Sequence, residues 1–205
     1  MSKLETITID TPSGSNTMQI GSTNTATINL GVSGDTINVP AGVTIANAGT
    51  ATGFGGANTP AFEAKRASAV QAITNETQTK IEFNTEIYDS AGAYDSSTNY
   101  RFTPQTAGKY FVYARVMCRA ETNGNLIIAE VSLRKNGSNI GSSRFDFKDS
   151  YGNNATPVIN QVVDMNGSSD YVEAWGLTKV NSGNAQFYND GNERTIFGAF
   201  LLIGA

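Results

Sequence analysis

The side chains of this chain that could do acid–base chemistry are carboxylates, because its 205 residues include no histidine. The common catalytic triads and imidazole-based metal sites are therefore excluded. A pair of carboxylates could still cleave a glycosidic bond. The acidic residues available for such a pair are Asp146, Asp149, Asp164, Asp170, Glu173, Asp190 and Glu193. No pattern typical of an aromatic-lined groove accompanies them, and isolated acidic residues in loops usually serve solvation, so we expect no enzymatic activity.

Cys118 is the only cysteine, so an intrachain disulfide cannot form. Because no histidine can activate it, we expect its thiol to be a small buried hydrophobic group. The run Asp190-Gly191-Asn192-Glu193 offers oxygen ligands for calcium but lacks the spacing of a recognised calcium loop. Turn formation alone explains its Asp-Gly step. We predict no cofactor and no metal site, and calcium binding stays open as the alternative for this loop.

The elements that position these residues are β-strands. Gly, Ser, Thr and Asn are abundant and long helix-period patterns are absent, which is typical of an all-β protein rich in turns. The strands expected after residue 60 cover residues 78–87, 100–103, 109–120, 126–135, 140–147, 157–165, 171–177 and 195–203. Asn136-Gly137 and Asn166-Gly167 are the strongest signals for hairpin turns.

Two of these strands are apolar on both faces, namely residues 109–118 and the closing strand 195–203. A strand with one face exposed to solvent would alternate apolar and polar residues, so both strands are expected to be covered on both faces. One cover is the opposing sheet, and a neighbouring subunit is the natural candidate for the other. We therefore predict an obligate homotrimer whose interface includes Tyr110, Phe111, Phe197 and Phe200.

Residues 1–59 differ from the rest, because Phe54 is their only aromatic residue and Lys3 their only basic one. Short alternating segments recur in them, namely Ile7-x-Ile9, Met18-x-Ile20, Ile28-x-Leu30, Ile37-x-Val39 and Val43-x-Ile45. Each offers too few apolar side chains to form a core in a single chain. We expect an intertwined trimeric β-stem that also attaches the protein to other virion proteins. A disordered polar tail is the alternative. The glycine-rich residues 53–60 mark the boundary with a head at residues 60–205.

Charge and hydropathy restrict the partners. The formal net charge is −4 and no basic cluster stands out, so nucleic acid is not expected as a partner. No apolar run approaches the roughly 18 residues that a membrane span requires, so we expect no membrane insertion. The N-terminus lacks the apolar core of a secretory signal. Either a signal has been removed, or the protein leaves its cell another way, such as host lysis with an assembled virus particle.

The order and spacing of several motifs after residue 60 resemble the globular head of complement C1q, a jelly roll of the tumour necrosis factor type. The motifs are Phe62-Glu-Ala-Lys-Arg66, Tyr94-Asp95, Phe102-Thr103-Pro104, Gly108-x-Tyr110-x-Val112, Val131-x-Leu133-Arg-Lys-Asn136-Gly137, Asp170-Tyr171-Val172-x-Ala174 and Phe197-Gly198-Ala199-Phe200-Leu201. Residues 31–53 also resemble segments of bacteriophage fibre proteins. The fold class implied is a β-stem followed by a C1q-like jelly-roll β-sandwich.

The resemblance implies that the closing strand ends beside the first strand of the head, at the base next to the stem. Because consecutive strands run mostly antiparallel, both Asn-Gly turns then fall at the base, and the loops within residues 120–125, 148–156 and 178–194 fall at the free tip. Long loops on a rigid sandwich are where binding usually resides. The tip residues predicted to bind a receptor are Tyr151, Asn153, Asn154, Phe187, Tyr188 and Asp190. For Phe187 and Tyr188, packing of the loop onto the sandwich is the alternative.

Two functions of different classes follow. The first is a homotrimeric structural fibre of a bacteriophage, on its tail or capsid, located in the virion, with a tip that binds a glycan or protein of the host surface. The second is a secreted bacterial C1q-like module that binds carbohydrate or protein. The stem-like segment and the missing signal favour the first.

Overall fold

The computed structural model describes residues 20, 27–30, 33–46, 58–67, 70–148 and 151–203. The chain divides into two compact units, Met1–Ala51 and Thr52–Ala205. In the first unit, no described residue lies in a strand. Its described large apolar side chains are all exposed, and these are Ile20, Ile28, Leu30, Ile37, Val39, Val43 and Ile45. The segments at residues 7–9 and most of the predicted boundary at 53–60 lie outside the described residues, so the trimeric stem stays a prediction.

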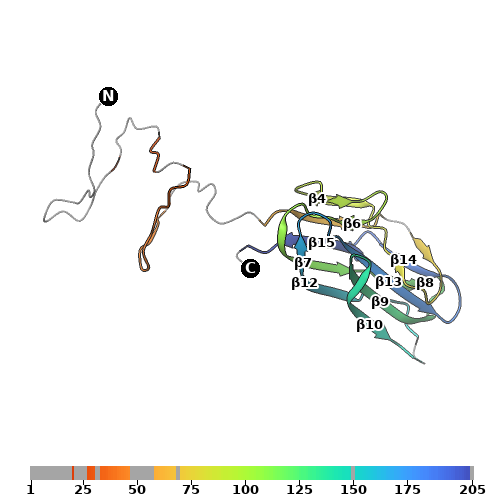
Figure 1. Cartoon of the computed structure of the whole chain (residues 1–205). Helices are drawn as coiled ribbons and strands as arrows, with labels where there is room; N and C mark the ends of the chain where they lie inside the picture. The colour runs from red at the N-terminus through yellow and green to blue at the C-terminus, as the bar shows by residue number, and fades with distance from the viewer. Residues whose placement is uncertain are drawn as a thin grey trace. The chain divides into compact units, whose positions relative to one another are not determined.

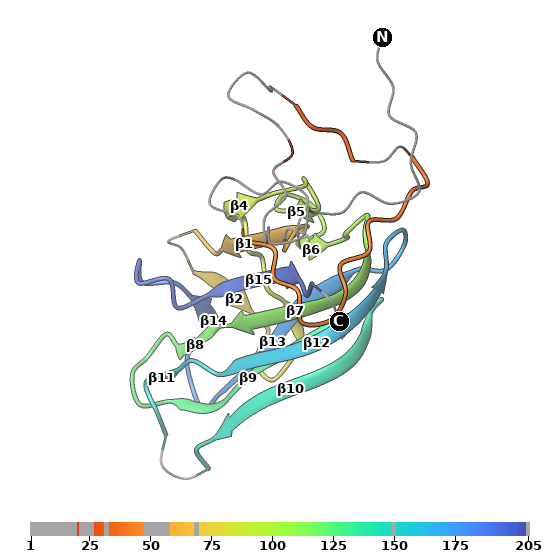
Figure 2. The same cartoon turned by 90° about the vertical axis from the view of Figure 1, so that its left-hand side faces the viewer.

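The second unit is built from strands in three sheets, and its described residues contain no helix (Figures 1 and 2). The first sheet has the order β12–β7–β15–β1–β4, formed by Val158–Asn166, Ala107–Arg115, Ile196–Leu201, Ala61–Lys65 and Thr85–Asp89. The second has the order β10–β9–β13–β6–β5, formed by Ser138–Asp146, Leu126–Lys135, Val172–Val180, Arg101–Phe102 and Tyr94–Asp95, and β3 (Thr79–Lys80) also pairs with β13. The third has the order β11–β8–β14–β2, formed by Asn154–Ala155, Met117–Ala120, Ala185–Tyr188 and Gln71–Ile73.

The sheets pack into a sandwich with an aromatic core. Phe62 on the first sheet stacks on Tyr94 and Phe102 of the second, with ring centroids 4.6 Å apart in each pair. The third sheet continues the layer of the first, because β7 leads directly into β8. It covers the second sheet through Phe187, whose ring is so close to Gly176 that a Cβ there would lie 2.8 Å from it. An all-β sandwich, as the composition predicted, is confirmed for this unit.

The long strand predicted over residues 109–120 is two strands in two sheets. The break falls at Val116, and the backbone N–H of Met117 donates to Oγ1 of Thr195 at 3.0 Å instead of continuing the ladder of the first sheet. The predicted strand over residues 78–87 is likewise divided into β3 and β4. The four strands β2, β5, β11 and β14 were not expected. Each spans only two to four residues, too few for alternation to be visible in the sequence.

The two Asn-Gly steps have different roles. Asn136 and Gly137 both have positive φ, 51° and 81°, and join β9 to β10 as the predicted tight hairpin turn. Asn166-Gly167 is not a hairpin turn, because it connects β12 of the first sheet to β13 of the second. Gly167 is required there by close packing, since a Cβ on it would lie 2.3 Å from the backbone nitrogen of Ala107.

Candidate functional site

The strand registers place the connections of the sandwich at two opposite ends. Ala107 pairs with Asn166, and Ala61 pairs with Phe200, so the starts of β7 and β1 share one end with the turn after β12. Arg115 pairs with both Val158 and Ile196 at the other end. The loops before β9, β12 and β15 therefore lie opposite the end at which β1 begins, as strand direction predicted. In Figure 1 the labels of β8 and β14 mark that loop-bearing end.

At this end, three loops are joined to one another by hydrogen bonds. The backbone N–H of Gly124 donates to Oδ1 of Asn153 at 2.7 Å. The hydroxyl of Ser182 donates to Oδ1 of Asn125 at 2.9 Å, and the side-chain amide of Asn184 donates to Glu121 at 2.8 Å. The loops at residues 121–125, 151–155 and 181–184 therefore form one connected surface. We call it the tip surface.

The outer face of the third sheet adjoins the tip surface and brings predicted residues together. Asn154 on β11 pairs with Arg119 on β8, which pairs with Gln186 on β14, so their side chains form one row. The guanidinium carbon of Arg119 lies 3.9 Å from the centroid of the Tyr188 ring. Its N–H groups donate to Oε1 of Gln186 at 2.9 and 3.3 Å. Asn154 and Tyr188 are thus both neighbours of Arg119, the first by strand pairing and the second by stacking.

Sequence reasoning missed Arg119 as a site residue. The signal was present, because Arg119 alternates with the buried Cys118 and Ala120 and so had to point outward. The partners of Arg119 come from residues 154, 186 and 188, and their proximity depends on the strand pairing of the third sheet.

The predicted tip residues fall into two groups. Tyr151 is 39% exposed, and Asn153, Asn154 and Asp190 are also exposed. Phe187 was a wrong choice, because it is 0% exposed and belongs to the core. Its place at the centre of β14, between Gln186 and Tyr188, turns its side chain toward the second sheet. The alternative interpretation, that it packs the loop onto the sandwich, holds for Phe187.

Asp190 belongs to a different part of the same end. Its carboxylate contacts Arg194 at 3.4 Å and accepts the backbone N–H of Asn192 at 3.1 Å. That backbone hydrogen bond, together with Arg194, lowers the pKa of Asp190. Both oxygens of Asp190 therefore have a local structural role in shaping this loop.

The predicted interface residues also divide into two groups. Tyr110 and Phe197 are both 0% exposed in the single chain, so they are core residues and cannot line a subunit interface. Phe111 and Phe200 point to the other face of the first sheet and are half-buried, with ring centroids 5.4 Å apart. Successive side chains of a strand point to opposite faces of the sheet, so the adjacent residues Tyr110 and Phe111 cannot both point to the interface.

The outer face of the first sheet is apolar around these two rings and polar beyond them, at Lys109, Arg115, Asn160 and Asp164. Val162, Phe111 and Phe200 are directly opposite one another on β12, β7 and β15. Val158 and Val162 are each 54% exposed. In the next row, the hydroxyl of Tyr113 donates to Glu63 at 2.5 Å. Burial, with Glu63 beside it, raises the pKa of Tyr113.

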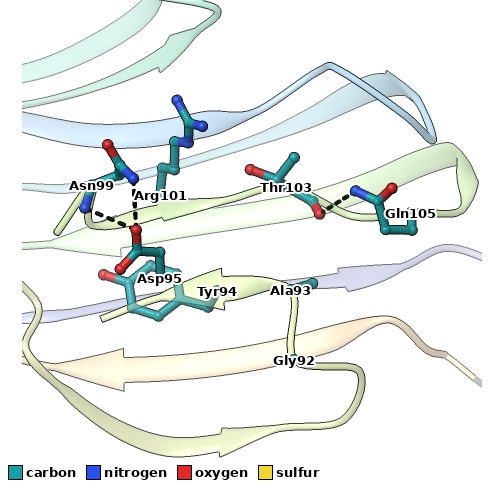
Figure 3. Close-up of a pocket in the computed structure, with 8 residues that line it drawn as sticks. All are labelled: Gly92, Ala93, Tyr94, Asp95, Asn99, Arg101, Thr103 and Gln105. Atoms are coloured by element: carbon teal, nitrogen blue, oxygen red, sulfur yellow. Dashed lines mark hydrogen bonds between the residues drawn. The ribbon is translucent and has the colours of Figure 1, made fainter. Parts of the chain in front are cut away.

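A pocket of about 320 Å³ lies beside β5 and β6 (Figure 3). It is lined by Gly92, Ala93, Tyr94, Asp95, Asn99, Arg101, Thr103 and Gln105. The Asp95 carboxylate accepts the backbone N–H groups of Thr98 and Ser97 at 2.9 and 3.0 Å and the side-chain amide of Asn99 at 2.7 Å. These hydrogen bonds, first of all that from Thr98, lower the pKa of Asp95. Asp95 is therefore fixed by its own turn.

The acidic residues that the sequence offered for catalysis, where the structure describes them, are paired with cations. The pairs are Asp146 with Arg144, Asp164 with Lys109, Asp170 with Lys135, Glu173 with Lys80, Asp190 with Arg194 and Glu193 with Lys65. Asp149 lies outside the described residues. Burial raises the pKa of the Cys118 thiol to about 12, and its side chain is 0% exposed, as expected of a buried hydrophobic group.

No protein-family model and no curated protein sequence matches the chain. Solved structures do match it. The tumour necrosis factor Eiger from S. frugiperda has a TM-score of 0.52 and 8% identity, over 71% of this chain and 93% of that one. The globular domain of the zebrafish complement 1qA protein has a TM-score of 0.48 and 16% identity, over 70% of this chain and 98% of that one. Murine APRIL at pH 5.0 has a TM-score of 0.48 and 10% identity, over 69% of this chain and 98% of that one. The likeness to Eiger shows that the second unit has the tumour necrosis factor type of jelly-roll fold.

Proposed function

We propose that the chain is the subunit of a homotrimeric bacteriophage fibre, in which a jelly-roll head binds the host surface and a β-stem joins it to the virion. The observation that carries this proposal is the apolar surface on the outer face of the first sheet. In one chain Phe111 and Phe200 are only half-buried there, beside the exposed Val162. A contiguous apolar patch on a sheet face is typical of a protein interface.

A trimer covers this surface in every subunit. Cyclic association gives each copy the same environment and closes the assembly, so that no apolar face remains. The likeness to a tumour necrosis factor supports self-association of this type. Obligate interfaces resemble a protein core, and the Val162–Phe111–Phe200 row has that composition.

The stem part of the proposal is supported by the exposed apolar residues of the first unit. Ile37, Val39, Val43 and Ile45 alternate along the chain, and each is at least 41% exposed. Winding three chains together would bury these side chains along a common axis. In this proposal the N-terminal segment contacts other virion proteins, and the fibre is assembled in the host cytoplasm and released by lysis.

The tip part of the proposal rests on the tip surface and the adjoining row through Arg119. Tyr151, Asn153, Asn154 and Tyr188 offer aromatic faces and amide groups, which suit a glycan or a protein of the host surface. Their loops are joined to one another and held by a rigid sandwich, which limits the conformational entropy lost on binding.

Two measurements on the full chain test the proposal. Light scattering is expected to give about three times the chain mass of 21.7 kDa, and a stable folded monomer at micromolar concentration would contradict the trimer. Immunogold electron microscopy of particles from the producing culture is expected to label the ends of fibres. Labelling of free protein in the medium, with none on particles, would instead support a secreted bacterial binding module.

A further inference from the structure

The outer face of the second sheet carries a second polar and aromatic surface, which the proposed function does not use. On β13 and the residue before it, Tyr171, Glu173 and Trp175 alternate and so share this face. Glu173 is directly opposite Arg134 of β9 on one side and Arg101 of β6 on the other. Two arginines therefore flank one strand, separated by two strand spacings, or roughly 10 Å.

Each arginine is stacked on an aromatic ring. The guanidinium carbon of Arg134 lies 3.9 Å from the Trp175 ring centroid, and that of Arg101 lies 4.4 Å from the Tyr171 ring centroid. The Arg134 side chain therefore leans toward the Trp175 end of β13, and the Arg101 side chain leans toward the Tyr171 end. Stacking fixes the plane of a guanidinium while leaving its terminal N–H groups able to form hydrogen bonds.

These N–H groups have no acceptor within the described part of the chain. Neither the guanidinium of Arg134 nor that of Arg101 forms an ion pair or a hydrogen bond with another described residue. The Nε atom of Arg134 is buried and has no partner there, which is uncommon for a buried polar group. Figure 3 shows the Arg101 side chain extending away from Asp95, its neighbour across the strand pair.

The one carboxylate between the arginines is already neutralised. Glu173 binds Lys80 at 2.5 Å with one oxygen and accepts the indole N–H of Trp175 at 3.0 Å with the other. Its side chain is only 6% exposed. Glu173 therefore neutralises neither arginine, and the nearest other carboxylate is Asp95, directly opposite Arg101 on β5.

We propose that this face, defined by Arg134, Trp175, Arg101 and Tyr171, binds an anionic polysaccharide through carboxylate groups on its sugars. A guanidinium matches a carboxylate with two parallel hydrogen bonds, and a ring can stack on the apolar face of a sugar. Two equivalent arginine–aromatic units suit a linear polymer in which the charged group repeats. The site is separate from the tip surface, so the proposal does not depend on receptor binding there.

The test measures binding of the full chain to immobilised polygalacturonate, a linear polymer of a carboxylate-bearing sugar. Its fully methyl-esterified form, which keeps the rings and loses the charge, is the matched ligand control. We expect binding to the acid form only, and weaker binding as the salt concentration rises. Arg134→Gln and Arg101→Gln are each expected to weaken binding roughly tenfold, because each removes charge-assisted hydrogen bonds.

The protein control is Arg144→Gln on the neighbouring strand β10, where Arg144 contacts Glu130 and Asp146. It removes the same charge and is expected to leave binding unchanged. Arg134→Lys keeps the charge and loses the planar fork, so an intermediate loss is expected, and this variant carries the test if Arg134→Gln fails to fold. The proposal is overturned if the acid form does not bind, if the ester or a DNA oligonucleotide binds equally well, or if Arg144→Gln is as damaging.

Discussion

Phe111 on β7 and Phe200 on β15 face each other across the ladder of the first sheet, with ring centroids 5.4 Å apart on the outer side of the sandwich. Their chain neighbours Tyr110 and Ala199 point inward and are 0% exposed. One pair of strands thus supplies both the core and the apolar outer face. This arrangement leads to the proposed trimer, because the outer rings are only partly covered within one chain.

Replacing Phe111 with Ser is expected to dissociate the trimer. Loss of a buried aromatic side chain at the centre of an interface typically costs about 2 kcal/mol or more, and the change occurs in all copies at once. Light scattering should show the mass fall toward 21.7 kDa. The matched control is Phe145→Ser, since Phe145 is 48% exposed and lies on β10 in the other layer. If both variants keep the trimer mass, the interface lies elsewhere.

Gly198→Ala is expected to destabilise the head by about 1–3 kcal/mol, the usual range for overpacking. A Cβ at this position would lie 2.4 Å from the Cζ atom of the Tyr113 ring, and that ring is held by its hydrogen bond to Glu63. Urea unfolding measures the change. In a Tyr113→Ala background the same substitution should cost little, and Gly152→Ala, with only ordinary contacts of 3.5 Å, should be tolerated. Equal costs in both backgrounds would contradict the assigned clash.

Asp95 is expected to make stability depend on pH in the acid range. Its folded pKa is lowered from the usual 3.8 by the N–H groups of Thr98 and Ser97. A group whose folded pKa is depressed contributes stability above its unfolded pKa, and this contribution is lost as pH falls through the folded pKa. Asp95→Asn should cost about 1 kcal/mol at pH 7, because the partly exposed site reduces the effect.

The measurement is urea unfolding of both proteins at pH 7 and in strong acid. The difference between them should narrow in acid, where Asp95 itself becomes protonated and neutral like the asparagine. A difference that stays constant from neutral to acid pH would mean that the carboxylate charge does not stabilise the turn.

Replacing Tyr151 and Tyr188 with Ala is expected to weaken adsorption to host cells without a large change in melting temperature. Tyr151 is 39% exposed and Tyr188 is bound mainly through the Arg119 guanidinium, so neither supports the core. Gln105→Ala, an exposed position at the opposite end, is the control. If adsorption survives the two tyrosine changes and is abolished by changes in the Asn136 turn, the end of the head that bears the Asn136 turn faces the host cell.

A fragment of residues 60–205 is expected to fold by itself. All of the strands that the structure describes, from β1 onward, lie within it, and its core is continuous through Phe62, Phe102 and Phe197. It should remain soluble and show a cooperative thermal transition by circular dichroism. Precipitation of this fragment, together with a sharp transition for the full chain, would place the boundary elsewhere.

Much of the head could be predicted because β-structure has local signals. The Asn136-Gly137 turn was identified correctly, since its positive φ angles favour those two residue types. The buried state of Cys118 followed from its apolar neighbours. Asn166-Gly167 was misjudged because the same dipeptide also serves a connection between sheets. Residue type alone does not distinguish a hairpin turn from a connection between sheets. The difference is whether the strand that follows pairs in the same sheet, as β10 does with β9, or joins the other sheet, as β13 does after β12.

By itself, the sequence determined that residues 109–118 and 195–203 have two mostly apolar faces, because alternation along a strand is visible in the order of residues. The tertiary structure decided which of the two faces packs in the core and which lies on the outside of the sandwich. Phe187 and Tyr188 are adjacent aromatics, yet one is 0% exposed and the other lies under Arg119, since β14 packs one of its faces on the second sheet. The pairs Arg134–Trp175 and Arg101–Tyr171 also depend on strand registers between distant residues. Such registers are set by the packing of the whole sandwich, so no local pattern in the chain contains them.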